Sequence, residues 1–194
     1  MMSLSRVTGA AGFLCAVLLV VNVARRGGLL PETSLTHAIA PFAPLTGLLA
    51  ITGVYLLFRR TAGTFGLVAY LANAAGLAGA FAVEYTLHFV FPYLQPGVVT
   101  VLLAGGTGRA FLVTSVVLLG GVIAFGVAAL RTKAVPAAAV ALYVGGMVPG
   151  ALRSALPLPV YLGGLVVAAA GIAWMAFTLW SRESASAREV LPGQ

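Results

Sequence analysis

The chain has 194 residues, of which 61% are hydrophobic and only 8% are charged. A soluble domain carries about 25% charged residues, so this composition excludes an ordinary water-soluble protein and predicts an all-α, polytopic integral membrane protein. The net charge of +7 does not indicate nucleic-acid binding, because the basic residues are scattered between apolar segments instead of clustered on one face.

Six apolar segments are long enough to cross the hydrocarbon core of a bilayer, which takes roughly 20 residues. They cover residues 7–24, 37–58, 64–91, 110–130, 134–152 and 160–180. The first ends in Asn22-Val-Ala-Arg-Arg26 instead of a small-x-small cleavage site, so we expect it to be retained as a helix. The sequence therefore predicts a six-helix transmembrane domain over residues 1–180 and a flexible, polar cytoplasmic tail over residues 181–194.

The basic residues between these segments predict the orientation. Seven of them lie on one predicted side and four on the other. The larger group is Arg6, Arg59, Arg60, Arg131, Lys133, Arg182 and Arg188, and the smaller group is Arg25, Arg26, Arg109 and Arg153. Because Lys and Arg accumulate in cytoplasmic loops, we expect both termini inside the cell and a multi-pass protein of the plasma (inner) membrane.

The connection over residues 92–108 lies on the predicted outer side and contains a short apolar stretch, residues 98–104. This stretch is too short to cross the bilayer. We expect it to lie in the membrane interface or to dip back into the membrane as a re-entrant segment.

Glu84 is the most unusual residue of the third segment. The chain has four acidic residues, and only Glu84 stands inside an apolar run. A carboxylate there costs a few kcal/mol or more unless it is paired, protonated or hydrated, and such residues are often functional. At about 1.5 Å per residue, the predicted orientation places Glu84 about 30 Å from the inner start of its helix, near the outer interface.

Polar and aromatic residues gather around Glu84 in the predicted helix. Glu84 and His88 are four residues apart, close enough for a hydrogen bond, and Asn73, Phe81 and Phe91 share their helix face. We expect this face to line a cavity near the outer leaflet. The predicted catalytic residues are Glu84, His88 and Tyr85, and the predicted substrate-binding residues are Asn73, Phe81, Phe89, Phe91, Tyr93, His37, Arg109 and Arg153.

The leading hypothesis is a membrane-embedded enzyme or binder of a lipophilic molecule, such as an isoprenoid or a lipid. A carboxyl group in an apolar pocket can keep its proton near neutral pH, and aromatic faces can stabilise a developing cation. Small integral-membrane terpene cyclases, which are isomerases or lyases, use this logic. The analogy is one of mechanism only, with Glu84 as the general acid and His88 as its partner.

Two alternatives use the same residues differently. A Glu84–His88 pair facing the bundle interior suits a proton- or cation-coupled transporter, which with six helices would require a homodimer. In a structural role, Glu84 and His88 would instead pair with each other or with Arg109 or Arg153 and pin helix ends together.

A metal site is a further alternative, because Glu84, His88 and His37 together offer three ligands, the number that catalytic zinc takes from a protein. His37 and His88 alone could flank a haem. The spacing matches no known metal signature, so we expect no metal and no cofactor. The expected partners are the lipid bilayer and a lipophilic small molecule, with no nucleic acid.

Overall fold

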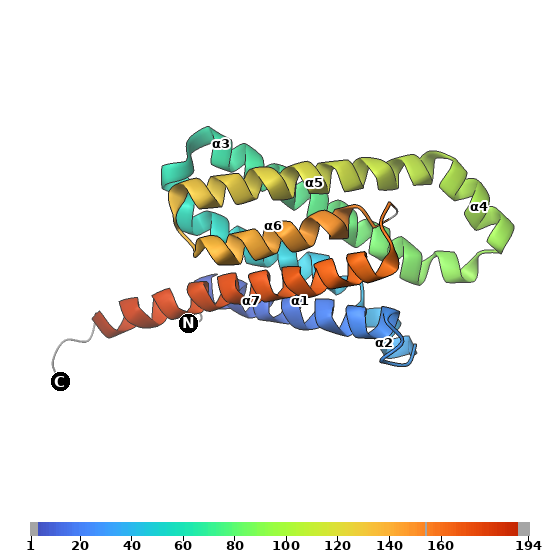
Figure 1. The fold of residues 1–194 in the computed structure, drawn as a ribbon, viewed down its shortest axis with the longest axis horizontal. Helices are drawn as coiled ribbons and strands as arrows, with labels where there is room; N and C mark the ends of the chain where they lie inside the picture. The colour runs from blue at the N-terminus through green and yellow to red at the C-terminus, as the bar shows by residue number, and fades with distance from the viewer. Residues whose placement is uncertain (1–3, 154, 190–194) are drawn as a thin grey trace.

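The computed structural model describes residues 4–153 and 155–189, and within these ranges the chain forms helices and no strand. The helices are α1 (Leu4–Arg26), α2 (Ser34–Ile39), α3 (Phe42–Phe89), the 3₁₀ turn η1 (Phe91–Tyr93), α4 (Pro96–Ala104), α5 (Gly106–Thr132), α6 (Ala137–Ala151) and α7 (Leu158–Glu189). The long helices lie side by side along the length of the molecule (Figure 1). The predicted all-α class is confirmed.

By length and apolar composition, four helical stretches in the described part of the chain could cross a membrane. They are Leu4–Arg26, Ser34–Tyr93, Gly106–Thr132 and Leu158–Arg182, and α6 is a shorter apolar helix. These apolar helices are those of a membrane protein. The count of six crossings and the orientation stay predictions.

The chain reverses direction inside α3, at Gly63. Gly63 has φ 58° and ψ −154°, a conformation that is essentially restricted to glycine. The two halves of α3 then run back along each other. The hydroxyl oxygens of Thr52 and Tyr70 are 3.1 Å apart, and the ring centroids of Phe42 and Phe81 are 6.3 Å apart. The two halves correspond to the second and third predicted segments.

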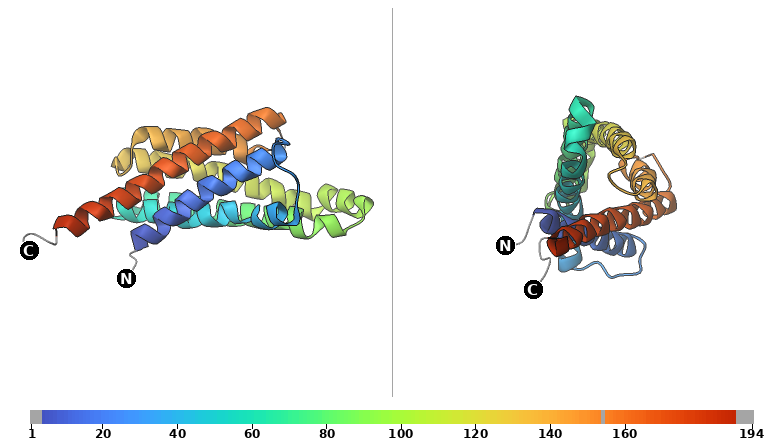
Figure 2. Two further views of the ribbon diagram at one scale, coloured as in Figure 1. Left: turned by 90° about the horizontal axis from the view of Figure 1, so that it is seen from below. Right: turned by 90° about the vertical axis from the view of Figure 1, so that its left-hand side faces the viewer.

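The helices α1, α3, α5, α6 and α7 contact one another in that order, and α7 closes the ring on α1. Seen from one end, these helices are arranged in a closed ring (Figure 2). Glycines allow close approach at the contacts. A Cβ atom on Gly121 would meet the backbone of Asn73, and one on Gly146 would meet the backbone of Ala168. This ring of helices encloses the core.

The two ends of the molecule differ. The chain enters and leaves at one end, and α2, the end of α3 and the start of α7 lie at the other (Figures 1 and 2). The tail that was predicted to be flexible from residue 181 is helical as far as Glu189, and residues 190–194 lie outside the described residues. The apolar stretch 98–104 forms part of α4, which has no buried residue, so it does not re-enter the bundle.

Candidate functional site

Two arginines bind the carboxylate of Glu84, which is only 13% exposed. Nη2 of Arg26, at the end of α1, lies 2.8 Å from Oε2 and 3.1 Å from Oε1. Nη1 of Arg153, in the turn between α6 and α7, lies 3.1 Å from Oε1. The carboxylate therefore joins three segments that are far apart in the sequence.

The two arginine contacts affect the predicted role of Glu84 as a general acid. Charge-assisted hydrogen bonds from guanidinium groups stabilise the ionised carboxylate, and an ionised carboxylate has no proton to donate. The predicted pairing with Arg153 is present, together with a second pairing, to Arg26, that was not predicted. The contacts thus favour an anchoring role for Glu84, and its role as a general acid stays a prediction.

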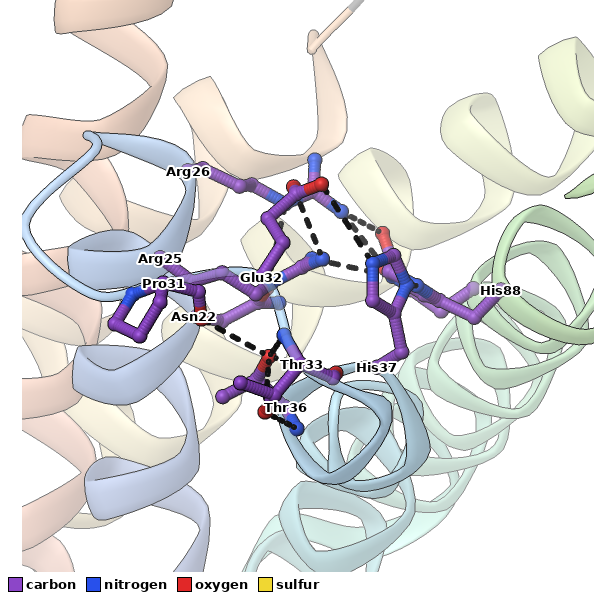
Figure 3. A network of polar contacts seen from close by, with 10 residues as sticks. Asn22, Arg25, Arg26, Pro31, Glu32, Thr33, Thr36, His37 and His88 are labelled. Atoms are coloured by element: carbon purple, nitrogen blue, oxygen red, sulfur yellow. Dashed lines mark hydrogen bonds and ion pairs between the residues drawn. The ribbon is translucent and has the colours of Figure 1, made fainter.

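A second group of contacts surrounds the first (Figure 3). Oδ1 of Asn22 accepts hydrogen bonds from Nη2 of Arg25 at 3.0 Å and from Nε of Arg26 at 3.3 Å. Nη2 of Arg25 also lies 3.3 Å from Nε2 of His88. The two neighbouring arginines in the last turn of α1 thus reach different side chains of α3: Arg25 contacts His88, and Arg26 contacts Glu84. Asn22 accepts a hydrogen bond from each arginine and so holds both in position.

The two histidines of the chain meet in this network. Nδ1 of His37 lies 3.0 Å from Nδ1 of His88, and Nε2 of His88 lies 3.3 Å from Oε2 of Glu84. The predicted Glu84–His88 contact is present in the structure. Because Nε2 of His88 faces both Arg25 and Glu84, its protonation decides whether it accepts a hydrogen bond from the first or donates one to the second.

Local structure brings His37 to this position. Thr33 and Thr36 form a capping box at the start of α2, which fixes the first turn of that helix and with it the side chain of His37. Glu32, just before the cap, lies 3.6 Å from Nη1 of Arg25 and 3.7 Å from Nε2 of His37. Its side chain is 66% exposed, so these contacts are weak. We call Asn22, Arg25, Arg26, Glu32, His37, Glu84, His88 and Arg153 the polar cluster.

The aromatic residues that were expected to surround Glu84 contact other aromatic rings in the structure, and their role in substrate binding stays a prediction. Tyr85 is exposed, and its ring contacts Phe81 and Phe89, at centroid distances of 6.1 and 4.9 Å. Tyr93 is 83% exposed, and Phe91 packs against Phe111. The rings of Phe81, Tyr85 and Phe89 contact one another in tilted arrangements along α3, because residues four apart lie on neighbouring turns of the helix.

A different aromatic residue, Tyr161, contacts the arginines of the polar cluster. The ring of Tyr161, at the start of α7, lies beneath both arginines that bind Glu84, 5.7 Å from Cζ of Arg26 and 6.0 Å from Cζ of Arg153. Such contacts favour a cation over the ring face. Tyr161 was not among the predicted residues, because it lies in a different helix and its sequence neighbours carry no charge.

Two other predicted residues lie away from the cluster. Asn73 is fully buried and exchanges hydrogen bonds with the hydroxyl of Tyr143, at 2.8 and 3.1 Å. It lies about 16 Å from Glu84 along the helix. Arg109 is exposed in the first turn of α5, and the ion pairs found among the described residues do not include it.

An apolar cavity with a volume of about 100 Å³ lies inside the ring of helices. Asn22 and Glu84 line it at the end that carries the polar cluster, and its lining continues along α7 from Tyr161 to Leu179. These α7 residues span about 27 Å. The cavity is therefore long and narrow, and it is polar mainly at one end.

A second cavity, of about 320 Å³, lies beside the polar cluster. Its lining includes three charged residues, Arg26, Glu32 and Arg153, together with Tyr161. The second cavity is therefore charged, whereas the first is mainly apolar. Tyr161 lines both cavities, and the arginines of the second bind the carboxylate that lines the first. The ion pairs of Glu84 thus stand at the boundary between an apolar and a polar space.

Among the residues that the structure describes, no group of three His, Cys, Asp or Glu side chains is arranged to hold a metal ion. The rings of His37 and His88 touch edge to face, with centroids 5.1 Å apart. This contact leaves no room for a haem between them, so the alternative in which both histidines flank a haem does not fit the geometry.

The described residues form an all-helical protein of membrane type, with an apolar cavity that ends at a cluster of partly buried charges. Comparison of the chain with protein-family models, with curated proteins and with solved structures found no match in any of the three.

Proposed function

We propose that this protein crosses the membrane six times and binds the apolar part of a lipophilic molecule in its central cavity. The observation that carries the proposal is the apolar cavity itself. Five helices enclose it, and the ion pairs of Glu84 lie at one of its ends.

The path of the chain supports six crossings. Arg26, Glu84 and Arg153 meet at one end of the bundle. The bend of α3, whose non-helical residue is Gly63, lies near the other end (Figure 1). Each of α1, the two halves of α3, α5, α6 and α7 therefore runs from one end to the other. An even number of crossings agrees with the entry and exit of the chain at one end. The excess of basic residues on that side favours a cytoplasmic location for it.

The chemistry of the cavity supports an apolar occupant. One water molecule needs roughly 10–15 Å³ of such volume and two to four polar partners. A cavity of about 100 Å³ has room for several waters, yet its walls offer few partners away from Asn22, Glu84 and the tyrosines. Apolar cavities of this kind stay dry and take up apolar molecules. The long, narrow shape suits a flexible chain.

Photolabelling tests this proposal. The probe is dodecanol with a diazirine at the end of its chain, added to the purified protein in a neutral detergent, with the labelled positions located by peptide mass spectrometry. We expect label on Ile172 and Met175, which line the cavity. Trp174 and Phe177 of the same helix are exposed and report labelling from the detergent side. Label only at these two exposed residues would show that the chain stays outside.

Two leucine substitutions in α6 provide the matched pair. Gly150 lines the cavity, and a Cβ atom there would reach Cδ2 of Leu165 at 3.4 Å, an ordinary contact. Gly145 has open space at its Cβ position and does not line the cavity. We expect Gly150→Leu to reduce the labelling of the cavity and Gly145→Leu to leave it unchanged, with thermal unfolding as the check that both variants fold.

One observation favours the alternative of a proton-coupled transporter. Glu84, His88 and His37 follow one another at 3.3 and 3.0 Å, and exposed Glu32 lies 3.7 Å beyond, so titratable groups connect the cavity to the surface. A transporter would take up protons with its cargo in liposomes, and Glu84→Gln would abolish that coupling. If the protein binds the lipophilic molecule and no protons move, the transporter alternative fails and the proposed binding function stands.

A further inference from the structure

The polar cluster shows which kind of lipophilic molecule the cavity would take, an inference that rests on the proposed function. We infer that the ligand is an anionic amphiphile. Its oxyanion head, a carboxylate or a phosphate, binds to Arg26 and Arg153 in the polar cavity, and its chain lies in the apolar cavity.

The charges of the cluster leave room for an anion. Within the polar cluster, Arg25, Arg26 and Arg153 face only two carboxylates, and the carboxylate of Glu84 serves two of these arginines. Nε of Arg25 is buried without a hydrogen-bond partner among the described residues. Buried donors are nearly always satisfied, so an unpaired donor here is unusual. Together with three arginines against two carboxylates, it shows that the cluster has more positive charge and more donors than its own acceptors match.

The two arginines are also held in position before any ligand binds. Nε of Arg26 donates to Asn22, and the ring of Tyr161 lies beneath the guanidinium groups of both Arg26 and Arg153. Fixing side chains in their binding conformation lowers the entropic cost of association. Guanidinium groups match the planar geometry of carboxylate and phosphate oxygens, and their grip on Glu84 shows that this pair can hold an oxyanion between them.

The two cavities are placed for a molecule with a head and a chain. Arg26 and Arg153 line the polar cavity, Glu84 lines the apolar one, and Tyr161 lines both. A ligand whose chain passes Tyr161 would therefore keep its head beside the arginines. Glu32 also lines the polar cavity and opposes an anion, but it is 66% exposed and faces Arg25 and His37, so solvent and these partners weaken its repulsion.

The test compares three diazirine probes with the same chain and different heads, namely dodecanol, dodecanoate and dodecyl phosphate. For the wild-type protein in neutral detergent, we expect the anionic probe that matches the site to saturate the labelling of Ile172 and Met175 at a concentration about tenfold below that of dodecanol, a ratio that one charge-assisted hydrogen bond can supply. A preference for dodecanoate assigns a fatty-acid-like ligand, and a preference for dodecyl phosphate assigns a phosphorylated one.

Substitutions locate the head. Arg153 is the more exposed of the two arginines, so Arg153→Gln should fold and should remove the preference for the anionic probe over dodecanol. Arg153→Lys should keep part of the preference because it keeps the charge. Arg109→Gln, at the exposed arginine outside the cluster, should keep all of it.

The outcomes separate the two proposals. Cavity labelling by dodecanol with no anion preference would overturn the anionic head and leave the proposed function standing. An anion preference that survives in Arg153→Gln would also overturn it, because the head would then bind elsewhere. If none of the three probes labels the cavity, the proposed function itself fails.

Discussion

Arg26 and Glu84 form an ion pair in which one guanidinium nitrogen contacts both carboxylate oxygens, at 2.8 and 3.1 Å. The pair joins the end of α1 to the second half of α3, and each side chain is only 13% exposed. Because Glu84 lines the apolar cavity and Arg26 lines the polar one, the pair fixes a cation where the two cavities meet.

The first prediction concerns this pair. Removing one partner of a buried ion pair leaves the other charge uncompensated, which typically costs about 3–5 kcal/mol. Glu84 keeps Arg153 when Arg26 is replaced, so we expect Arg26→Gln to lower the free energy of unfolding by about 3 kcal/mol. Chemical or thermal unfolding in detergent would measure the change.

The double variant and two other arginines serve as controls. Arg26→Gln with Glu84→Gln should recover part of the loss, because no buried charge is then left alone. Arg153→Gln should cost about 1 kcal/mol, since Arg153 is much more exposed, and Arg109→Gln should stay within about 0.5 kcal/mol. Equal losses for Arg26 and Arg109 would show that burial of the pair contributes nothing.

Part of this cluster follows from the sequence, and the reason is local geometry. Helical spacing alone places His88 next to Glu84, and the apolar pattern with its basic flanks brings Arg153 to the same end of the bundle. Hydropathy also predicts the helical segments, because a bilayer requires long apolar runs. These inferences need only the distance along one helix and the end at which each helix finishes.

Contacts between helices could not be predicted in this way. Arg26 and Glu84 are 58 residues apart, and only the packing of α1 on α3 brings them together. One signal was present, because Arg25 and Arg26 stand on the predicted outer side, against the charge bias that sets the orientation. Likewise, helical phase places Tyr85 next to Glu84 without showing that packing turns Tyr85 outward, onto the ring of Phe89.

The second prediction concerns the buried hydrogen bonds between Asn73 and Tyr143. Tyr143→Phe removes the hydroxyl and leaves the buried amide of Asn73 without its partner. An unsatisfied buried polar group costs about 1–3 kcal/mol, so we expect unfolding to become easier by about 2 kcal/mol. Adding Asn73→Leu to Tyr143→Phe should recover stability, whereas Tyr93→Phe, at a tyrosine that is 83% exposed, should have no measurable effect.

The third prediction concerns the reversal in α3. Gly63 has φ 58° and ψ −154°, and a Cβ atom there would meet nothing within 4 Å. Any cost of Gly63→Ala is therefore a backbone cost, which we expect to be about 2 kcal/mol. Gly145→Ala in α6 also meets open space but lies in a regular helix, so it should stabilise the protein by about 0.5–1 kcal/mol. Unfolding curves for the two variants should shift in opposite directions, and a shift of the same sign would argue against strain at Gly63.

The last prediction decides between one and two crossings for residues 34–93. Cysteine labelling in intact cells with a membrane-impermeant maleimide can show this, starting from Cys15→Ala, which removes the single cysteine of the chain. If α3 crosses twice, Ser34→Cys and Gln95→Cys lie on the same, outer side and both react, while Thr61→Cys reacts only after the cells are opened. A single crossing would instead place residues 34 and 95 on opposite sides of the membrane. We expect the first pattern, because the contacts of Thr52 with Tyr70 and of Phe42 with Phe81 require the second half of α3 to return along the first.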